Sequence, residues 1–149
     1  ELLAALVANG VKPIEGQSID LGQVRLAGIA DLLPNHTRSE RLQALQTQDK
    51  PLLLLTHNPD SLAWLPQLTQ PFVMLAGHTH GGQVRLPWFG ESRALTTNCD
   101  LPTWRARGLT KFGSEPYLHV SAGMGTSPFA RIRVASPPEV SLVTLEAGF

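Results

Sequence analysis

The chain is poor in the features that would assign it to several common classes of protein. It has one cysteine, Cys99, in 149 residues, which excludes an internal disulfide and a cysteine-based zinc site. Its 12 basic and 12 acidic residues cancel, so charge gives no reason to expect nucleic acid as a partner. No apolar run approaches the length of a membrane span, and no signal peptide is visible.

What the chain does contain is enough apolar sequence for a core. Hydrophobic residues make up 42% of the 149 positions, which predicts one folded domain at most. The sequence starts without Met and enters a helical pattern at once, over residues 1–9, with a stop at Asn9-Gly10. This start is typical of a piece cut from a larger protein or of a processed chain.

The next part of the chain predicts short strands and then a helix. Between residues 11 and 32, turns are expected near Glu15-Gly16 and Leu21-Gly22, and residues 24–28 alternate in polarity. Residues 35–48 predict a loop followed by a helix from about Ser39.

The clearest local unit is "PLLLLTHNPDSLAWL", residues 51–65. The run from Leu52 to Leu55 is typical of a strand buried on both faces, and it ends at Thr56-His57. Asn58 is a good N-cap and Pro59 suits a first helical position, so a helix is expected from Pro59 to about residue 65.

A second buried strand is expected from Pro71 to Ala76, ending at Gly77. Residues 106–123 predict a hairpin that turns near Gly113-Ser114, and residues 137–147 predict a final strand. The fold class is therefore α/β or α+β, with a β-rich C-terminal portion. Ligands of such sheets bind at the carboxyl ends of the strands.

Two histidines stand at the second strand end, in "GHTHGG". In extended backbone, His78 and His80 point to the same face, so both imidazoles could reach one metal ion or two adjacent ions. The flanking glycines allow backbone conformations that a Cβ would block, and they leave room for a metal. The alternative is a pair of polar loop histidines, because a bare His-x-His motif has a real rate of false positives.

His57 ends the other buried strand. Alone, it would be better explained as a buried histidine bonded to a carbonyl or as a polar residue that flanks a helix. Because His78 and His80 lie at a matching strand end, a metal site shared by the three histidines becomes the better interpretation. Neutral imidazole binds zinc, iron, nickel or copper, so the residues leave the metal's identity open.

Carboxylates are scarce near these histidines. A two-metal hydrolytic site needs them to bridge and neutralise the ions. Asp60 is explained as a residue of the first helical turn, and Asp31 serves equally well as a turn residue or a ligand. The three histidines therefore make an incomplete two-metal site.

The Gly-rich stretch "SAGMGTSPFARIR" could hold a phosphate through backbone N–H groups and the guanidinium groups of Arg131 and Arg133. The two arginines would share a face of a regular strand. A surface loop with strand arginines explains the stretch equally well, since it has neither a P-loop lysine nor a nucleophile elbow.

Three segments together resemble the calcineurin-like metallophosphoesterases, and most closely their bacterial YkuE- and YaeI-type branch. They are "LLLLTHNPD", "LAGHTHGGQVRLP" and "VSAGMGTSPFARIRVASPPEVSLVTL". The resemblance covers about residues 11–145. It implies a sandwich of two β-sheets flanked by helices, with two divalent metal ions, such as Mn, Zn or Fe, at the strand ends.

The resemblance also implies roles for single residues. His57 and His78 would bind one metal, and His80 the other. Asn58, Gln83 and Arg131 would contact substrate. The family's first three ligand blocks, including the residue that protonates the leaving group, are absent from this sequence. The chain is therefore predicted to be the C-terminal portion of a single phosphoesterase domain.

The implied activity is hydrolysis of a phosphomonoester or phosphodiester by metal-activated water. Substrates would be small or lipid-linked phosphoesters, including a sugar diphosphate such as UDP-2,3-diacylglucosamine. Residues 1–149 alone are expected to be almost inactive. We expect the cytoplasm or the cytoplasmic face of a membrane, with any membrane contact made by residues outside this sequence.

Two other functions stay open on the residues alone. One is a mononuclear zinc hydrolase with three histidine ligands. The other is a non-catalytic module that folds and binds a partner.

Overall fold

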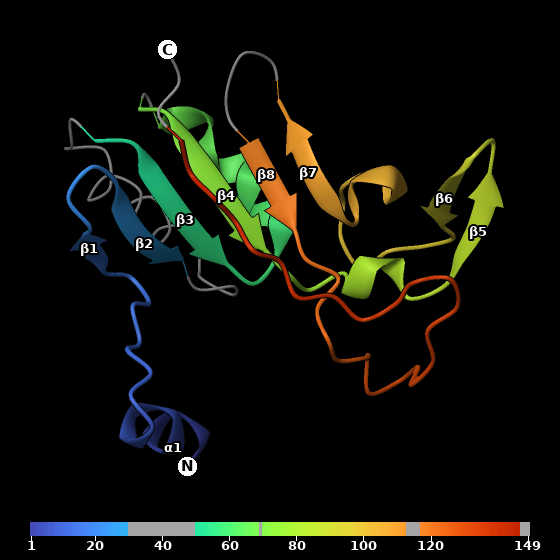
Figure 1. Cartoon of the computed structure of the whole chain (residues 1–149), viewed down its shortest axis with the longest axis horizontal. Coiled ribbons are helices and arrows are strands. Elements are labelled where there is room, and N and C mark those ends of the chain that lie inside the picture. The colour runs from blue at the N-terminus through green and yellow to red at the C-terminus, as the bar shows by residue number, and fades with distance from the viewer. Residues whose placement is uncertain (30–49, 69, 113–116, 147–149) are drawn as a thin grey trace.

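A six-stranded sheet forms the centre of the molecule (Figure 1). The structure is a computed structural model that describes residues 1–29, 50–68, 70–112 and 117–146. The sheet has the order β1-β2-β3-β4-β8-β7, and β5 and β6 form a separate hairpin. The helices are α1 (Leu2–Ala8), η1 (Pro59–Gln67), η2 (His80–Gly82) and η3 (Thr103–Arg105), and the strands are β1 (Ser18–Asp20), β2 (Arg25–Ile29), β3 (Leu52–Thr56), β4 (Phe72–Ala76), β5 (Arg85–Trp88), β6 (Glu91–Ala94), β7 (Gly108–Lys111) and β8 (Tyr117–Val120).

The middle of the sheet is parallel. Strands β2, β3, β4 and β8 run in one direction, and the edge strands β1 and β7 are antiparallel to their neighbours. The four parallel strands therefore end at one edge of the sheet, where α/β proteins bind ligands. This mixed α/β architecture confirms the predicted fold class. In the described ranges it comprises one large sheet and one hairpin.

The core lies on the face of the sheet that η1 covers. Leu52 and Leu54 of β3, Met74 of β4 and Leu118 of β8 are buried there, and Leu65 of η1 packs onto them. The 3-10 helix η1 lies where the sequence predicted a helix, and the Asn58 side chain caps it by accepting a hydrogen bond from the Asp60 amide.

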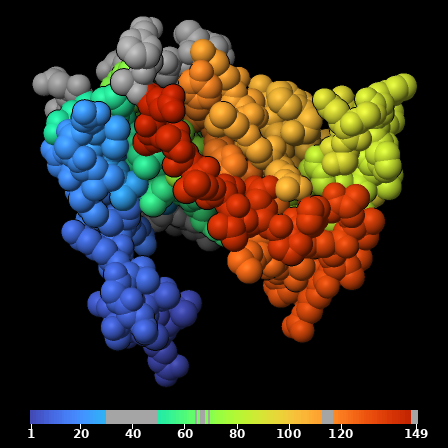
Figure 2. Space-filling model, in the orientation of Figure 1, coloured from blue at the N-terminus to red at the C-terminus, as the bar shows by residue number. Residues whose placement is uncertain are grey.

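The other face of the sheet is only partly covered, so the expectation that β3 is buried on both faces is wrong. Residues 53 and 55 are half-buried, in contrast to their fully buried neighbours. The segment after residue 136, red in Figures 1 and 2, crosses this face. Among the described residues, this extended segment covers part of the face.

The predicted final strand is a further correction. Residues 137–146 form no strand in the described part of the chain. Side-chain bonds hold this segment to the sheet: Glu139 pairs with Arg107, and Ser141 contacts His119. The polar side chains point inward, whereas Val140 and Leu142 are 82% and 96% exposed. The face of this segment that contacts the sheet is therefore polar.

Several other expectations have clear outcomes. Helix α1 ends as predicted at Asn9-Gly10, with Gly10 at φ +84°. The predicted strands at 71–76 and in the hairpin are β4, β7 and β8. In β2 the buried side chain is that of Ala27. The expected helix from Ser39, Asp31 and the turn at Gly113-Ser114 lie outside the described residues.

Candidate metal centre

Two adjacent parallel strands bring His57 and His78 together. His57 directly follows β3, and His78 lies two residues after β4. The two strand ends are joined by a hydrogen bond of 3.0 Å from the Gly77 amide to the His57 carbonyl. Because β3 and β4 pair in register, the side chains that follow them reach the same edge of the sheet.

The two imidazoles are in direct contact. Nδ1 of His78 lies 3.0 Å from Nε2 of His57, and the ring centroids are 4.9 Å apart with an interplanar angle of 75°. On its far side, Nε2 of His78 lies 3.0 Å from the carbonyl oxygen of Asn98. Since a carbonyl can only accept, this nitrogen carries the proton, and Nδ1 of His78 presents its lone pair toward His57.

This geometry fits a pair of ligands for one metal ion. Two nitrogens at typical zinc–nitrogen distances, with bond angles between 90° and tetrahedral, lie about 3.0–3.4 Å apart. A metal-bound histidine usually donates its other N–H to a carbonyl or carboxylate, as His78 does to Asn98. His57 and His78 therefore suit one metal. Across the described residues, no three His, Cys, Asp or Glu side chains are arranged to hold an ion by themselves.

His80 lies on a tightly wound loop, not on the extended backbone that the sequence suggested. His78 and His80 have φ of 68° and 51°, and Thr79 between them is helical. Positive φ is costly for residues other than glycine, and such strain concentrates at functional sites. The strained backbone therefore favours a site role over a chance pair of histidines.

The surroundings of His80 favour the neutral form of its imidazole. Partial burial lowers its pKa most, the backbone of Gly125 opposes this, and the charges of Arg133, His78 and His57 lower the pKa further. The neutral ring is the form that binds a metal. The three histidines thus influence one another electrostatically, although only His57 and His78 are in contact.

Two of the three glycines of "GHTHGG" serve close packing, whereas a Cβ on Gly77 would meet no atom within 4 Å. Gly81 and Gly82 are buried at φ of 66° and 78°. A Cβ on Gly81 would lie 2.9 Å from Cβ of Ala122, and one on Gly82 would lie 2.2 Å from Cβ of Ala94. Both glycines are thus required by positive φ and by close contact with a neighbouring segment.

Buried polar side chains hold this loop in place. Thr79 donates to the carbonyl of Ala106 at 2.6 Å and accepts from the Gly81 amide. Arg85, at the start of β5, is 7% exposed and donates to the Gly81 carbonyl at 2.8 Å and to Ser92 of β6. Burial lowers the pKa of Arg85, and the charge of Arg107 adds to this.

Gln83, predicted to contact substrate, has its side chain bonded to the loop that follows β8. Its Nε2 donates to the carbonyls of Ala130 at 2.7 Å and Ile132 at 3.3 Å, and its Oε1 accepts from the Ser127 amide. The substrate role stays a prediction, while the structure shows Gln83 as an anchor of residues 127–132.

Arg133 is bonded to the fold, whereas Arg131 is exposed. The two arginines do not share the face of a strand. Arg133 donates to five backbone carbonyls, those of His80, Ala122, Gly123, Gly125 and Ser136. Arg131 is exposed and makes no hydrogen bond or ion pair with the described residues. Of the two, Arg131 is available to an anionic ligand, and its predicted substrate contact stays a prediction.

The third predicted substrate contact, Asn58, lies beside His57 and caps η1. One of its side-chain atoms is therefore committed to the fold, and its contact with substrate also stays a prediction. Its neighbour Asp60 accepts from the Asp100 amide at 2.9 Å. That bond fixes the segment that carries Asn98 next to His78.

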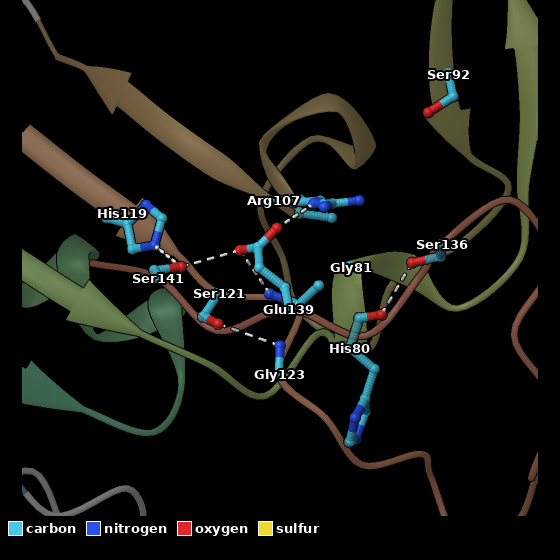
Figure 3. Close-up of polar contacts among 12 residues, drawn as sticks. His80, Gly81, Ser92, Arg107, His119, Ser121, Gly123, Ser136, Glu139 and Ser141 are labelled. Carbon is cyan, nitrogen blue, oxygen red and sulfur yellow. Dashed lines mark hydrogen bonds and ion pairs between the residues drawn. The ribbon is translucent and has the colours of Figure 1, made fainter. Parts of the chain in front are cut away.

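Figure 3 shows how the C-terminal segment is joined to this region. Glu139 pairs with Arg107 at 2.5 Å and accepts from Ser141, whose hydroxyl lies 2.9 Å from Nε2 of His119. Ser136, on the same segment, donates to the His80 carbonyl at 3.4 Å. Ser136 thus joins the C-terminal segment to the loop of His80.

Sequence reasoning missed the residues that act through their backbone or from a distance. Asn98 supplies the carbonyl that orients His78, and its side chain donates to the His78 carbonyl at 3.1 Å. It lies 20 residues from its partner in a polar loop. No spacing or residue type signals such a contact, because a backbone carbonyl is present at every position.

Comparison with known proteins identifies the class. The chain is 30% identical over 147 residues to UDP-2,3-diacylglucosamine pyrophosphatase LpxG of Chlamydia muridarum, covering 95% of this chain and 44% of LpxG. It is 36% identical over 96 residues to phosphodiesterase YaeI of Escherichia coli, covering 64% of this chain and 32% of YaeI. The uncharacterized metallophosphoesterase YkuE of Bacillus subtilis is 28% identical over 131 residues, which cover 86% of this chain and 42% of YkuE.

The paired strand-end histidines and these relatives define the class as metallophosphoesterases, and the chain belongs to the calcineurin-like family of them. It spans less than half the length of each of these three relatives. No family model matches the chain, and no solved structure matches it.

Proposed function

We propose that this chain supplies part of the active site of a metal-dependent phosphoester hydrolase. The contact between Nδ1 of His78 and Nε2 of His57, with His78 oriented by Asn98, is the observation that carries the proposal. Relatives named as a pyrophosphatase and a phosphodiesterase support the same reaction class. The finer substrate class, a lipid-linked sugar diphosphate, follows the name of LpxG.

Each residue would have a separate role in the proposed active site. His57 and His78 would hold one divalent metal ion, and His80 a second. The metal ions supply positive charge that polarises the phosphoryl group and acidifies water. Asn98 keeps the proton of His78 away from the ligand nitrogen, and Arg133 holds the carbonyl of His80 and hence its loop. Arg131, which is exposed, would pair with an anionic oxygen of the substrate.

The test is hydrolysis of bis-p-nitrophenyl phosphate with Mn²⁺ by the protein that contains this chain. We expect His78→Ala to lower kcat/KM at least about 100-fold, because changes to groups that only orient a metal ligand already cost 10–100-fold. His119→Ala is the matched control, since the ring of His119, in β8, contacts Ser141 of the C-terminal segment.

Equal activity of the His78→Ala and His119→Ala variants would contradict the proposal and favour a non-catalytic module. For residues 1–149 alone we expect weak metal binding and negligible turnover, because only two ligands converge in the described structure. Turnover by that chain comparable to a complete family member would contradict this part.

A further inference from the structure

The backbone of His78 is held in a strained turn. The Thr79 amide donates to the Gly77 carbonyl at 2.8 Å, so His78 stands at the centre of a three-residue turn. With φ of 68° at His78, this is the rare and strained form of the γ-turn. A strained backbone persists only where its surroundings hold it in place. The contacts that hold this turn therefore decide where the imidazole of His78 lies.

Every polar group of Thr79 is bonded. Besides the amide, its carbonyl accepts from the Gly82 amide at 2.8 Å. Its hydroxyl donates to the Ala106 carbonyl at 2.6 Å and accepts from the Gly81 amide at 3.2 Å. Because Thr79 is only 3% exposed, these bonds are made away from bulk water. The hydroxyl therefore joins the loop of the histidines to a segment that lies 27 residues further along the chain.

That segment is the connection between β6 and β7, residues 95–107, which runs from the hairpin back to the large sheet (Figure 1). It supplies the Ala106 carbonyl to the hydroxyl of Thr79. It also supplies Asn98, whose side chain donates to the His78 carbonyl at 3.1 Å and whose own carbonyl lies 3.0 Å from Nε2 of His78. The connection therefore holds the strained turn at three points, two on His78 and one on Thr79.

Of these three points, the hydroxyl of Thr79 is the one that a single substitution removes with little change of shape. A valine at this position would leave the Ala106 carbonyl and the Gly81 N–H buried without a partner. Leaving such groups unpaired costs more than the hydrogen bond contributes. The loop would then relax from the strained turn, and the imidazole of His78 would move with it.

We propose that Thr79 is a positioning residue of the candidate metal centre. Its hydroxyl fixes the turn at His78, and this turn directs Nδ1 of His78 toward the position beside Nε2 of His57 where a metal ion would lie. Thr79 acts through His78 and needs no contact with the metal. This inference rests on the proposed function, and it explains why a buried and fully bonded threonine stands between the two histidines.

The test measures the dissociation constant for Zn²⁺ of the protein that contains this chain, by competition with a chromogenic chelator. Thr79→Val should weaken binding at least about tenfold, because losing a group that orients a metal ligand costs 10–100-fold in affinity. Thr79→Ser keeps the hydroxyl and should bind Zn²⁺ like the parent. Thr110→Val is the matched control, since it makes the same chemical change at a half-buried position of β7.

Nitrogen-15 spectra of the histidine rings in the metal-free protein separate positioning from general destabilisation. In the parent, Nε2 of His78 carries the proton, because it faces the Asn98 carbonyl. Thr79→Val should change the ring signals of His78 and leave those of His119 in place. A merely structural role would lower the melting temperature without moving the His78 signals. If Thr79→Val does not fold, Thr79→Ala takes its place and should still bind Zn²⁺ more weakly than Thr79→Ser.

Parental Zn²⁺ affinity in Thr79→Val, or unchanged ring signals of His78, would overturn the inference. So would an equal loss of affinity in Thr110→Val or in Thr79→Ser. The two proposals fail in different ways. Absence of hydrolysis of bis-p-nitrophenyl phosphate by the parent would overturn the proposed function itself. Hydrolysis that His78→Ala abolishes, with parental Zn²⁺ affinity in Thr79→Val, would overturn only the role of Thr79.

Discussion

At the scale of single residues, the site depends on side chains that satisfy backbone carbonyls. Arg133 serves five carbonyls from three parts of the chain, and Gln83 serves two carbonyls and one amide. A buried carbonyl that loses its donor costs more than the bond contributed, because water does not replace it. The histidines are therefore positioned by residues that need never touch a ligand.

Arg133→Gln should lower the free energy of unfolding by about 1–3 kcal/mol, since several part-buried carbonyls lose their donor. Arg131→Gln is the matched control and should change it by less than about 0.5 kcal/mol, because Arg131 is exposed. Urea unfolding followed by circular dichroism measures both. Equal effects of the two substitutions would disprove the structural role of Arg133.

At the scale of elements, the loop between β4 and β5 explains why the glycine pair is needed. Five of its residues, from His78 to Gln83 with the exception of Thr79, have positive φ. Two of them also lie against neighbouring segments where a Cβ would collide. The loop is held in a conformation that few residue types can adopt, and this conformation presents His78 and His80.

Gly82→Ala should be more destabilising than Gly90→Ala. Both residues have φ near +80°, so an alanine at either position costs about 1–2 kcal/mol of stability in this left-handed conformation. Only Gly82 faces a collision, with Ala94 at 2.2 Å, and overpacking adds about 1–3 kcal/mol, whereas Gly90 has open space.

The double variant Gly82→Ala/Ala94→Gly offers a check on this cause. It should recover part of the loss seen in thermal unfolding, because the colliding Cβ is gone. No recovery would mean that the collision with Ala94 is not the source of the effect.

The same elements show what the sequence could predict. Runs such as Leu52–Leu55 and the pair Asn58-Pro59 encode a strand and a helix start locally, and both are present. The convergence of His57 and His78 followed from the rule that parallel strands end at one edge. The positive φ of His78 and the polar inward face of residues 137–146 depend on tertiary contacts, which residue patterns do not encode.

At the scale of the whole molecule, the C-terminal segment is held against the sheet by an ion pair. Partial burial alone would raise the pKa of Glu139. Four interactions outweigh this effect and lower the pKa below the ordinary glutamate value of 4.5. They are the bonds with Arg107 and the Ala122 amide, the charge of Arg107 and the bond with the Ser141 hydroxyl. The ionised form of Glu139 is therefore favoured in the folded protein. None of the helices in the described ranges has the length and apolar character needed to cross a membrane.

This lowered pKa predicts the sign of a pH effect. A carboxylate with a depressed pKa stabilises the fold above its unfolded pKa, and that contribution is lost as the pH falls through the folded value. The parent should lose unfolding free energy as the pH falls below about 4.5, and the Glu139→Gln variant should lose less over the same range. Glu91→Gln, at an exposed position of β6, should leave the pH profile of the parent in place. Identical acid profiles for the parent and Glu139→Gln would contradict the role of the ion pair.

The central claim is that His57, His78 and His80 are metal ligands. Nitrogen-15 spectra of the histidine rings, recorded while Zn²⁺ is added to the chain, test it most directly. We predict shifts at Nε2 of His57, at Nδ1 of His78 and in the ring of His80, with the ring of His119 unchanged because it is bonded to Ser141. Equal shifts at His119, or none at His57 and His78, would contradict the account.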